Sequence, residues 1–175
     1  MKKIILFTSI LLLLLGCKVY GKDIDQQIYS AAVKYCNQYN VDIYLFYAIY
    51  ESEGSIKDPT CMSSVNYDGS VDIGIMQINS NNTEVMQRCG VTDLYNVEQN
   101  IKCAVYLMSV NSKWLEKKEI PTTVFNLAAM YNSPKSFFNY FEGKYTEECP
   151  TAKYALKTYN TYIDYCEGTK LLLND

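Results

Sequence analysis

Apolar side chains recur at helical spacing through most of the chain after residue 22. The first such pattern covers residues 23–39, and it predicts a helix. A second helix is expected to begin after Asp42, a suitable N-cap, and to end near Gly54. Similar patterns predict further helices over residues 97–116, over 121 to just before Pro134, and over 151–166.

One stretch between these helices has a different pattern. Asp68-Gly69, a typical hairpin-turn pair, separates the short segments 65–67 and 70–73. Together the patterns predict a mainly α domain of the α+β class, with one small β-hairpin wing and no internal repeat.

The N-terminus has the pattern of an export signal. Met1–Lys3 is positively charged, and residues 4–15 are apolar but too few to span a bilayer comfortably. We therefore expect residues 1–21 to be a signal peptide and 22–175 to be one domain. Two processing sites compete: cleavage after Gly21, or a lipobox at 14–17 in which the signal ends at Gly16 and Cys17 carries a lipid anchor.

Composition excludes several function classes. The net charge is −3 and no basic stripe stands out, so nucleic acid is not an expected partner. The chain has no His, which excludes Ser-His-Asp and Cys-His nucleophiles and the usual zinc hydrolase sites. We expect no metal or cofactor, and acid/base chemistry must then come from a carboxyl group, a Lys or a Tyr.

Six cysteines remain if Cys17 is lipidated or removed. An even number in an exported domain predicts disulfides, and the pairing stays open. The six are Cys36, Cys61, Cys89, Cys103, Cys149 and Cys166.

Glu51 is the candidate acid. It follows an apolar and aromatic run near the end of the second predicted helix, and Tyr47 and Ala48 share its face. Burial and the negative helix C-terminus would both raise its pKa, so that it could protonate a glycosidic oxygen. An ordinary exposed Glu at a helix end is the alternative.

Two later segments carry polar side chains that burial does not explain. In the run from Asp72 to Ser80, Gln77 and Asn79 are interleaved with isoleucines, and Gly74 suits a close approach to a ligand. Tyr131-Asn132 ends a predicted helix, where the Tyr hydroxyl could hydrogen-bond a catalytic carboxyl. A core aromatic and a helix C-cap are the alternatives for this pair.

In order along residues 25–140, these segments resemble the lytic transglycosylases with an SLT-type, goose-lysozyme-like domain. The motifs are Glu51-Ser52, Gly74 to Gln77, Asn100-Ile101 with Tyr106-Leu107, and Tyr131-Asn132. The run 72–80 is most similar to the short members found with secretion, conjugation and pilus machines. Ser133-Pro134 departs from the family, which often has a small residue and Gly there, and no motif lies beyond Cys149.

The resemblance implies a lysozyme-like fold and cleavage of the β-1,4 bond between N-acetylmuramic acid and N-acetylglucosamine. Glu51 would protonate the leaving oxygen and then take the proton of the C6 hydroxyl, closing a 1,6-anhydro ring. Ser52, Asp72 and Tyr131 would support catalysis. The substrate-binding residues would be Gly74, Met76, Gln77, Asn79 and Asn132.

Peptidoglycan strands are thus the expected partner, and the periplasm or cell envelope is the expected location. We expect a monomer that serves either general wall remodelling or a secretion, pilus or phage machine. Two alternatives remain open. Asp72 could act as a second carboxylate in a hydrolytic muramidase. An inactive domain that binds glycan or a protein partner would retain the motifs without the chemistry.

Overall fold

The protein is described by a computed structural model, which covers residues 18–19, 22–23, 25–54, 58 and 60–172. Most of these residues are helical, and the predicted mainly α architecture with a small antiparallel β element is confirmed. Cys17 and nearly all of the predicted signal peptide lie outside the described residues.

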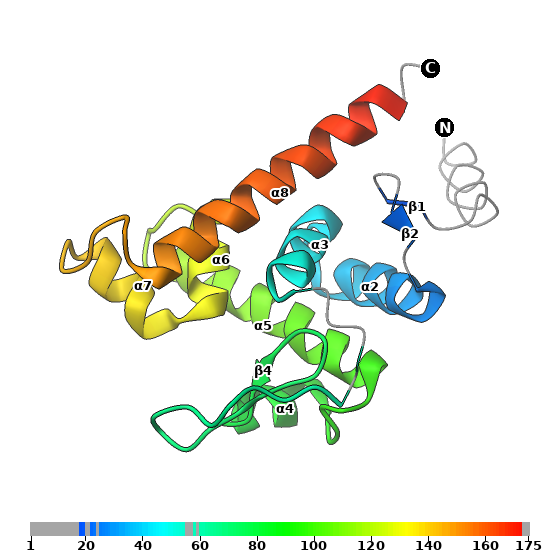
Figure 1. The fold of residues 1–175 in the computed structure, drawn as a ribbon, viewed down its shortest axis with the longest axis horizontal. Coiled ribbons are helices and arrows are strands. Elements are labelled where there is room, and N and C mark those ends of the chain that lie inside the picture. Colours follow the sequence, from blue (N-terminus) through cyan, green and yellow to red (C-terminus); the bar gives the residue numbers. More distant parts are fainter. Residues whose placement is uncertain (1–17, 20–21, 24, 55–57, 59, 173–175) are drawn as a thin grey trace.

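Seven helices are described, and Figure 1 shows how they are arranged. Helix α5 runs through the middle of the molecule, with the β3–β4 region and α4 on one side and the long α8 along the other. The helix bounds are α2 Gln26–Tyr39, α3 Ile43–Ser52, α4 Thr83–Cys89, α5 Val97–Lys117, α6 Val124–Asn132, α7 Pro134–Phe141 and α8 Pro150–Leu172.

Helix starts follow capping side chains. The side chain of Asp42 accepts a hydrogen bond from Tyr44 N at 2.8 Å, and that of Asn96 accepts one from Gln99 N at 3.0 Å, as predicted for N-caps. Helix α2 begins later than the predicted residue 23, because Asp25 caps it by accepting from Gln27 N at 2.8 Å.

Two helices were not predicted. Helix α4 has seven residues, too few to show a clear apolar period. Helix α7 begins at Pro134, which we interpreted only as a stop signal. Proline is well tolerated at the first helical position, and Ser133 caps this helix by accepting from Ser136 N at 3.3 Å.

The described sheets are small. Strand β3 (Asp72–Ile73) pairs antiparallel with β4 (Ile78–Asn79), and β1 (Lys18–Val19) pairs with β2 (Lys22–Asp23). The predicted turn at Asp68-Gly69 is present, since Asn66 N donates to Ser70 O at 2.8 Å, but the regular strand pair lies after it. We call residues 60–82, which contain this turn and β3–β4, the wing.

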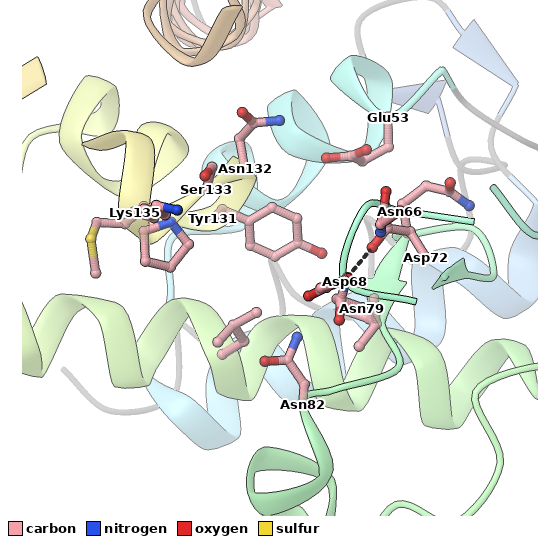
Figure 2. Close-up of a pocket in the computed structure, with 15 residues that line it drawn as sticks. Glu53, Asn66, Asp68, Asp72, Asn79, Asn82, Tyr131, Asn132, Ser133 and Lys135 are labelled. Carbon is pink, nitrogen blue, oxygen red and sulfur yellow. Dashed lines mark hydrogen bonds between the residues drawn. The ribbon is translucent and has the colours of Figure 1, made fainter. Parts of the chain in front are cut away.

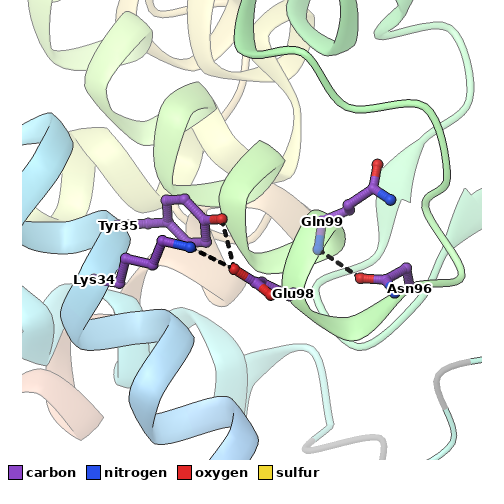
Figure 3. A network of polar contacts seen from close by, with 5 residues as sticks. All are labelled: Lys34, Tyr35, Asn96, Glu98 and Gln99. Atoms are coloured by element: carbon purple, nitrogen blue, oxygen red, sulfur yellow. Dashed lines mark hydrogen bonds and ion pairs between the residues drawn. The ribbon is translucent and has the colours of Figure 1, made fainter.

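A buried apolar cluster joins α2, α3, α5 and the wing, with Phe46, Ile49, Ile78 and Ile101 almost fully buried. A polar network closes one edge of it: Lys34 Nζ and Tyr35 Oη on α2 both donate to Glu98 Oε1 on α5, at 2.7 and 2.9 Å (Figure 3). These contacts hold α2 against the start of α5.

All six cysteines of the predicted disulfide set are free thiols in the structure. Cys103 is hydrogen-bonded to Cys89, and burial raises the pKa of Cys103 to about 12. Disulfide formation therefore stays a prediction. Within the described residues, no helix has both the length and the apolar character needed to cross a membrane.

Candidate active site

A cavity of about 450 Å³ lies between the wing and the junction of α6 and α7 (Figure 2). One wall comes from the end of α3 and from the wing, and the other comes from α5, α6 and the start of α7. Its lining residues are Glu53, Asn66, Asp68, Asp72, Gln77, Ile78, Asn79, Asn82, Leu107, Met130, Tyr131, Asn132, Ser133, Pro134 and Lys135.

The carboxyl group in the upper part of Figure 2 belongs to Glu53, which the sequence analysis did not select. Glu53 follows the last residue of α3, and its N–H donates to Ile49 O at 2.9 Å, which continues the helical bonding. Its side chain is half-buried and accepts a hydrogen bond from Tyr154 Oη of α8 at 2.6 Å.

Burial raises the pKa of Glu53 to about 7, and the negative charge of Asp72 acts in the same direction. The hydrogen bond from Tyr154 and the charge of Lys157 lower this pKa, but they do not outweigh burial. A carboxyl group with such a pKa is partly protonated at neutral pH, so it can donate a proton to a ligand in the cavity and later take one back.

Asp72 stands on the wing and is held by amide side chains. Its Oδ1 accepts from Asn79 Nδ2 at 2.8 Å, and its Oδ2 accepts from Asn66 Nδ2 at 3.4 Å. Ser70 accepts from the same two amides and donates to Asp68 Oδ1 at 2.6 Å. The wing thus presents a preorganised set of carboxylates and amides to the cavity.

The turn between β3 and β4 is anchored from below by Asn100 of α5. Asn100 Nδ2 donates to Ile73 O and Leu94 O, both at 2.9 Å, and its Oδ1 accepts from Met76 N at 2.9 Å. A Cβ at Gly74, where φ is +74°, would lie 2.4 Å from Asn100 Nδ2. The Asn100-Ile101 motif therefore secures the turn that carries Gln77 to the cavity.

Two of the residues predicted to contact sugar lie outside the described cavity lining. Gly74 is required for its close packing on Asn100, and neither it nor Met76 is among the described residues that line the cavity. Met76 is fully buried in the core, and its backbone makes the polar contacts. The predicted residues Asp72, Gln77, Asn79, Tyr131 and Asn132 do line the cavity.

Tyr131 lines the cavity, near the centre of Figure 2, and is mostly buried. Its hydroxyl donates to Met76 O at 2.7 Å, so it bonds the wing turn where a catalytic carboxyl was expected. Burial, with the charge of Glu53 as a further cause, raises the pKa of Tyr131 well above its usual value, so the phenol stays protonated. Asn132 accepts from Thr151 Oγ1 at 3.0 Å, which ties α6 to α8.

Glu51 lies on the α8 side of α3. Its carboxyl accepts a hydrogen bond from Tyr165 of α8, and it is not among the described cavity-lining residues. Ser52 also faces α8: its Oγ donates to Ala48 O at 2.8 Å and lies 2.7 Å from Thr158 Oγ1. Both side chains of the Glu-Ser motif thus attach α3 to α8.

Helix geometry explains the difference between the two carboxyl groups. Successive residues are rotated by about 100°, so residues 51 and 53 point to nearly opposite sides. Glu51 shares its face with Tyr47, whose ring packs on Tyr165, whereas Glu53 follows Ile49 by one turn. The Glu-Ser motif therefore points to the acid on the α8 side, whereas the acid two residues later faces the cavity.

Sequence reasoning also missed Tyr154, because it lies beyond the last motif and among 17 tyrosines. Tyr154 and Thr158 are four residues apart, so they share one face of α8, and both contact the end of α3. The spacing of polar hydroxyl groups along this helix was the available signal.

Comparisons with known proteins identify the family of the chain. No curated protein matches the chain. The family described as the transglycosylase SLT domain matches residues 30–148, which is more than half of the chain. The matched range includes Glu51, Glu53, the wing and Tyr131, and it supports the lysozyme-like α+β fold. The chain therefore belongs to the transglycosylase SLT domain family of peptidoglycan-directed, glycan-cleaving enzymes.

Proposed function

We propose that this protein is a lytic transglycosylase that cleaves the β-1,4 bond between N-acetylmuramic acid and N-acetylglucosamine, with Glu53 as its acid and base. The observation that carries the proposal is the half-buried carboxyl of Glu53, which has a pKa of about 7 and lines the cavity beside Asp72. Glu53 replaces Glu51 in the role that the motif had suggested.

The reaction needs one carboxyl group for two proton transfers. Protonated Glu53 gives its proton to the glycosidic oxygen, the bond from that oxygen to muramoyl C1 breaks, and positive charge develops at C1. The Glu53 carboxylate then removes the proton of the muramoyl C6 hydroxyl. Oxygen O6 bonds to C1, a 1,6-anhydro ring closes, and Glu53 is protonated again without consumption of water.

The neighbouring side chains have distinct tasks in this proposal. Tyr154 positions the Glu53 carboxyl through its 2.6 Å hydrogen bond. Tyr131 holds the wing turn through Met76 O. Gln77, Asn79 and Asn132 line the cavity and supply amide groups that suit sugar hydroxyl and acetamido groups.

Product analysis tests the proposal. Purified cell walls are digested with wild type, Glu53→Gln and Glu51→Gln, and the released fragments are weighed by mass spectrometry. We expect 1,6-anhydro ends from wild type and Glu51→Gln, and about 10²- to 10⁴-fold less product from Glu53→Gln. Undiminished product from folded Glu53→Gln would refute the assignment.

A hydrolytic muramidase is the second candidate, because Asp72 lines the same cavity and its charge raises the pKa of Glu53. In that reaction Asp72 would either activate the water that attacks C1, or attack C1 itself to form a glycosyl-enzyme that water then hydrolyses. The products would then carry reducing ends, heavier than anhydro ends by one water, and the same mass spectra distinguish the two reactions.

Substrate location places the site of action outside the cytoplasm, because SLT domains act on peptidoglycan. Four further properties stay predictions: export by the N-terminal signal, a lipid on Cys17, the monomeric state, and service to a secretion, pilus or phage machine. The mass of the mature N-terminus tests the first two: a chain that begins at unmodified Lys22 would exclude the lipid anchor.

A further inference from the structure

The cavity is charged unequally on its two walls. Glu53, Asp68 and Asp72 lie on the wing side, and hydrogen bonds from Ser70 keep the pKa of Asp68 below its usual value, so it is ionised. Lys135 lies on the opposite side, next to Ser133 (Figure 2). Among the described residues that line the cavity, Lys135 is the only cation.

Lys135 reaches this position because a new helix starts directly after α6. Ser133 and Pro134 begin a new helix directly at the cavity, and Lys135 stands in its first turn. A helix N-terminus carries partial positive charge, so a cation there is unfavourable for the helix. Stability of α7 therefore gives no reason for a lysine at this position.

No acidic partner within the described residues explains Lys135 either. The ion pairs of those residues use Lys34, Arg88, Lys144 and Lys153. Lys135 is exposed, so its ammonium is accessible to a ligand in the cavity. The amide of Ser136 is already bound by the Ser133 side chain, and that of Phe137 by Ser133 O, so an anion here would be recognised mainly by the ammonium group.

We propose that Lys135 binds carboxylates of the acidic peptide attached to muramic acid, and thereby selects and orients peptide-bearing glycan strands. This inference rests on the proposed function. The carboxylates of the wing repel such a peptide and Lys135 attracts it, so the substituted side of the muramoyl ring faces α7. A carboxylate and an ammonium form a charge-assisted hydrogen bond, which salt weakens at an exposed site.

The test compares two substrates that differ only in the peptide. Glycan strands are used with their peptides, or after an amidase has removed them. For Lys135→Gln we expect kcat/KM to fall about 3- to 10-fold on peptide-bearing strands and by clearly less on stripped strands. Lys135→Arg should restore most of the kcat/KM lost on peptide-bearing strands. For wild type, added salt should reduce the preference for peptide-bearing over stripped strands.

A matched control removes a lysine elsewhere. Lys113 is exposed on α5 and does not line the cavity, so Lys113→Gln should leave kcat/KM unchanged on both substrates. Equal losses for Lys135→Gln on the two substrates, or no loss on either, would overturn the inference.

Binding separates this inference from the proposed function. Glu53→Gln protein, with and without Lys135→Gln, is sedimented with insoluble peptide-bearing or stripped cell-wall glycan. We expect the second substitution to weaken sedimentation only with the peptide-bearing material. This result would support the inference even if wild type released no product, and unchanged sedimentation would contradict it.

Discussion

The two sides of the end of α3 carry the same chemical group in different surroundings. On the cavity side, the carboxyl of Glu53 stands beside Asp72, and its pKa is raised to about 7. On the other side, the carboxyl of Glu51 is bound by Tyr165 and packed against α8. Both glutamates contact a tyrosine of the same helix, so the hydrogen bond does not distinguish them. What distinguishes them among the described residues is the cavity, which Glu53 lines and Glu51 does not.

Exchanging each carboxyl for an amide gives the largest contrast. Glu53→Gln should lower activity about 10²- to 10⁴-fold, because the acid is lost. Glu51→Gln should keep activity within about 3-fold and destabilise the fold by about 1–2 kcal/mol, because it weakens the bond to Tyr165. Wall digestion and urea unfolding of both variants measure this, and the reverse pattern would return the catalytic role to Glu51.

Glu53 should also make the stability of the fold depend on pH. The pKa of Glu53 is raised in the folded state, so its favourable contribution is present below about 4.5 and is lost as pH rises through about 7. At pH 8, Glu53→Gln should therefore be more stable than wild type, by roughly 1–3 kcal/mol. At pH 4 this gain should vanish. A gain of the same size at both pH values would contradict the raised pKa.

The attachment of the wing can be broken without touching either glutamate. Gly74→Ala places a Cβ 2.4 Å from Asn100 Nδ2 at a φ of +74°, and should cost about 2–4 kcal/mol of stability. Gly69→Ala is the matched control, with φ +81° and nothing within 4 Å of the added Cβ, and should cost about 1–2 kcal/mol. Equal losses in thermal unfolding would argue against the packing of Gly74 on Asn100.

The charge of Asp72 can be removed to sharpen the electrostatic part of the comparison. Activity requires protonated Glu53, so it should fall about tenfold per pH unit above pH 7. Asp72→Asn lowers the pKa of Glu53, so the fall should begin at a lower pH. A pH–rate profile of each protein checks this, and an alkaline limb that stays in place would show that Asp72 does not act on Glu53.

The smallest effect is expected for the tyrosine of α8. Tyr154→Phe removes a hydrogen bond that lowers the pKa of Glu53, so the alkaline limb should move to higher pH. Loss of positioning should also reduce kcat about 3- to 10-fold with little change in KM. Tyr159→Phe, on an exposed position of the same helix, should behave like wild type. A fall in kcat without a shift of the pH–rate profile would show that Tyr154 has only a structural role.

The elements that the sequence predicted well are those with long apolar periods and clear caps. Helices α2, α3, α5, α6 and α8 belong to this group, and Asp42 and Asn96 cap two of them as expected. Helix α4 is too short for a period, and α7 begins at a proline. Such signals act locally, so they mark single helices and not the contacts between them.

The site was predictable where neighbouring residues share a strand or turn. The run from Asp72 to Asn79 brings several polar groups to one cavity because one short antiparallel pair carries them. Whether Glu51 or Glu53 lines the cavity depends on which side of α3 is covered by α8. That contact joins residues more than a hundred positions apart, and no local pattern encodes it.

The family match ends at residue 148, two residues before α8 begins. A fragment excised at that boundary would retain every family motif and lose Tyr154, Thr158 and Tyr165, the three hydroxyl groups that hold the last turn of α3. Its glutamates would both be open to solvent on the side that α8 now shields. The smallest active unit of this enzyme should therefore be longer than its recognisable domain.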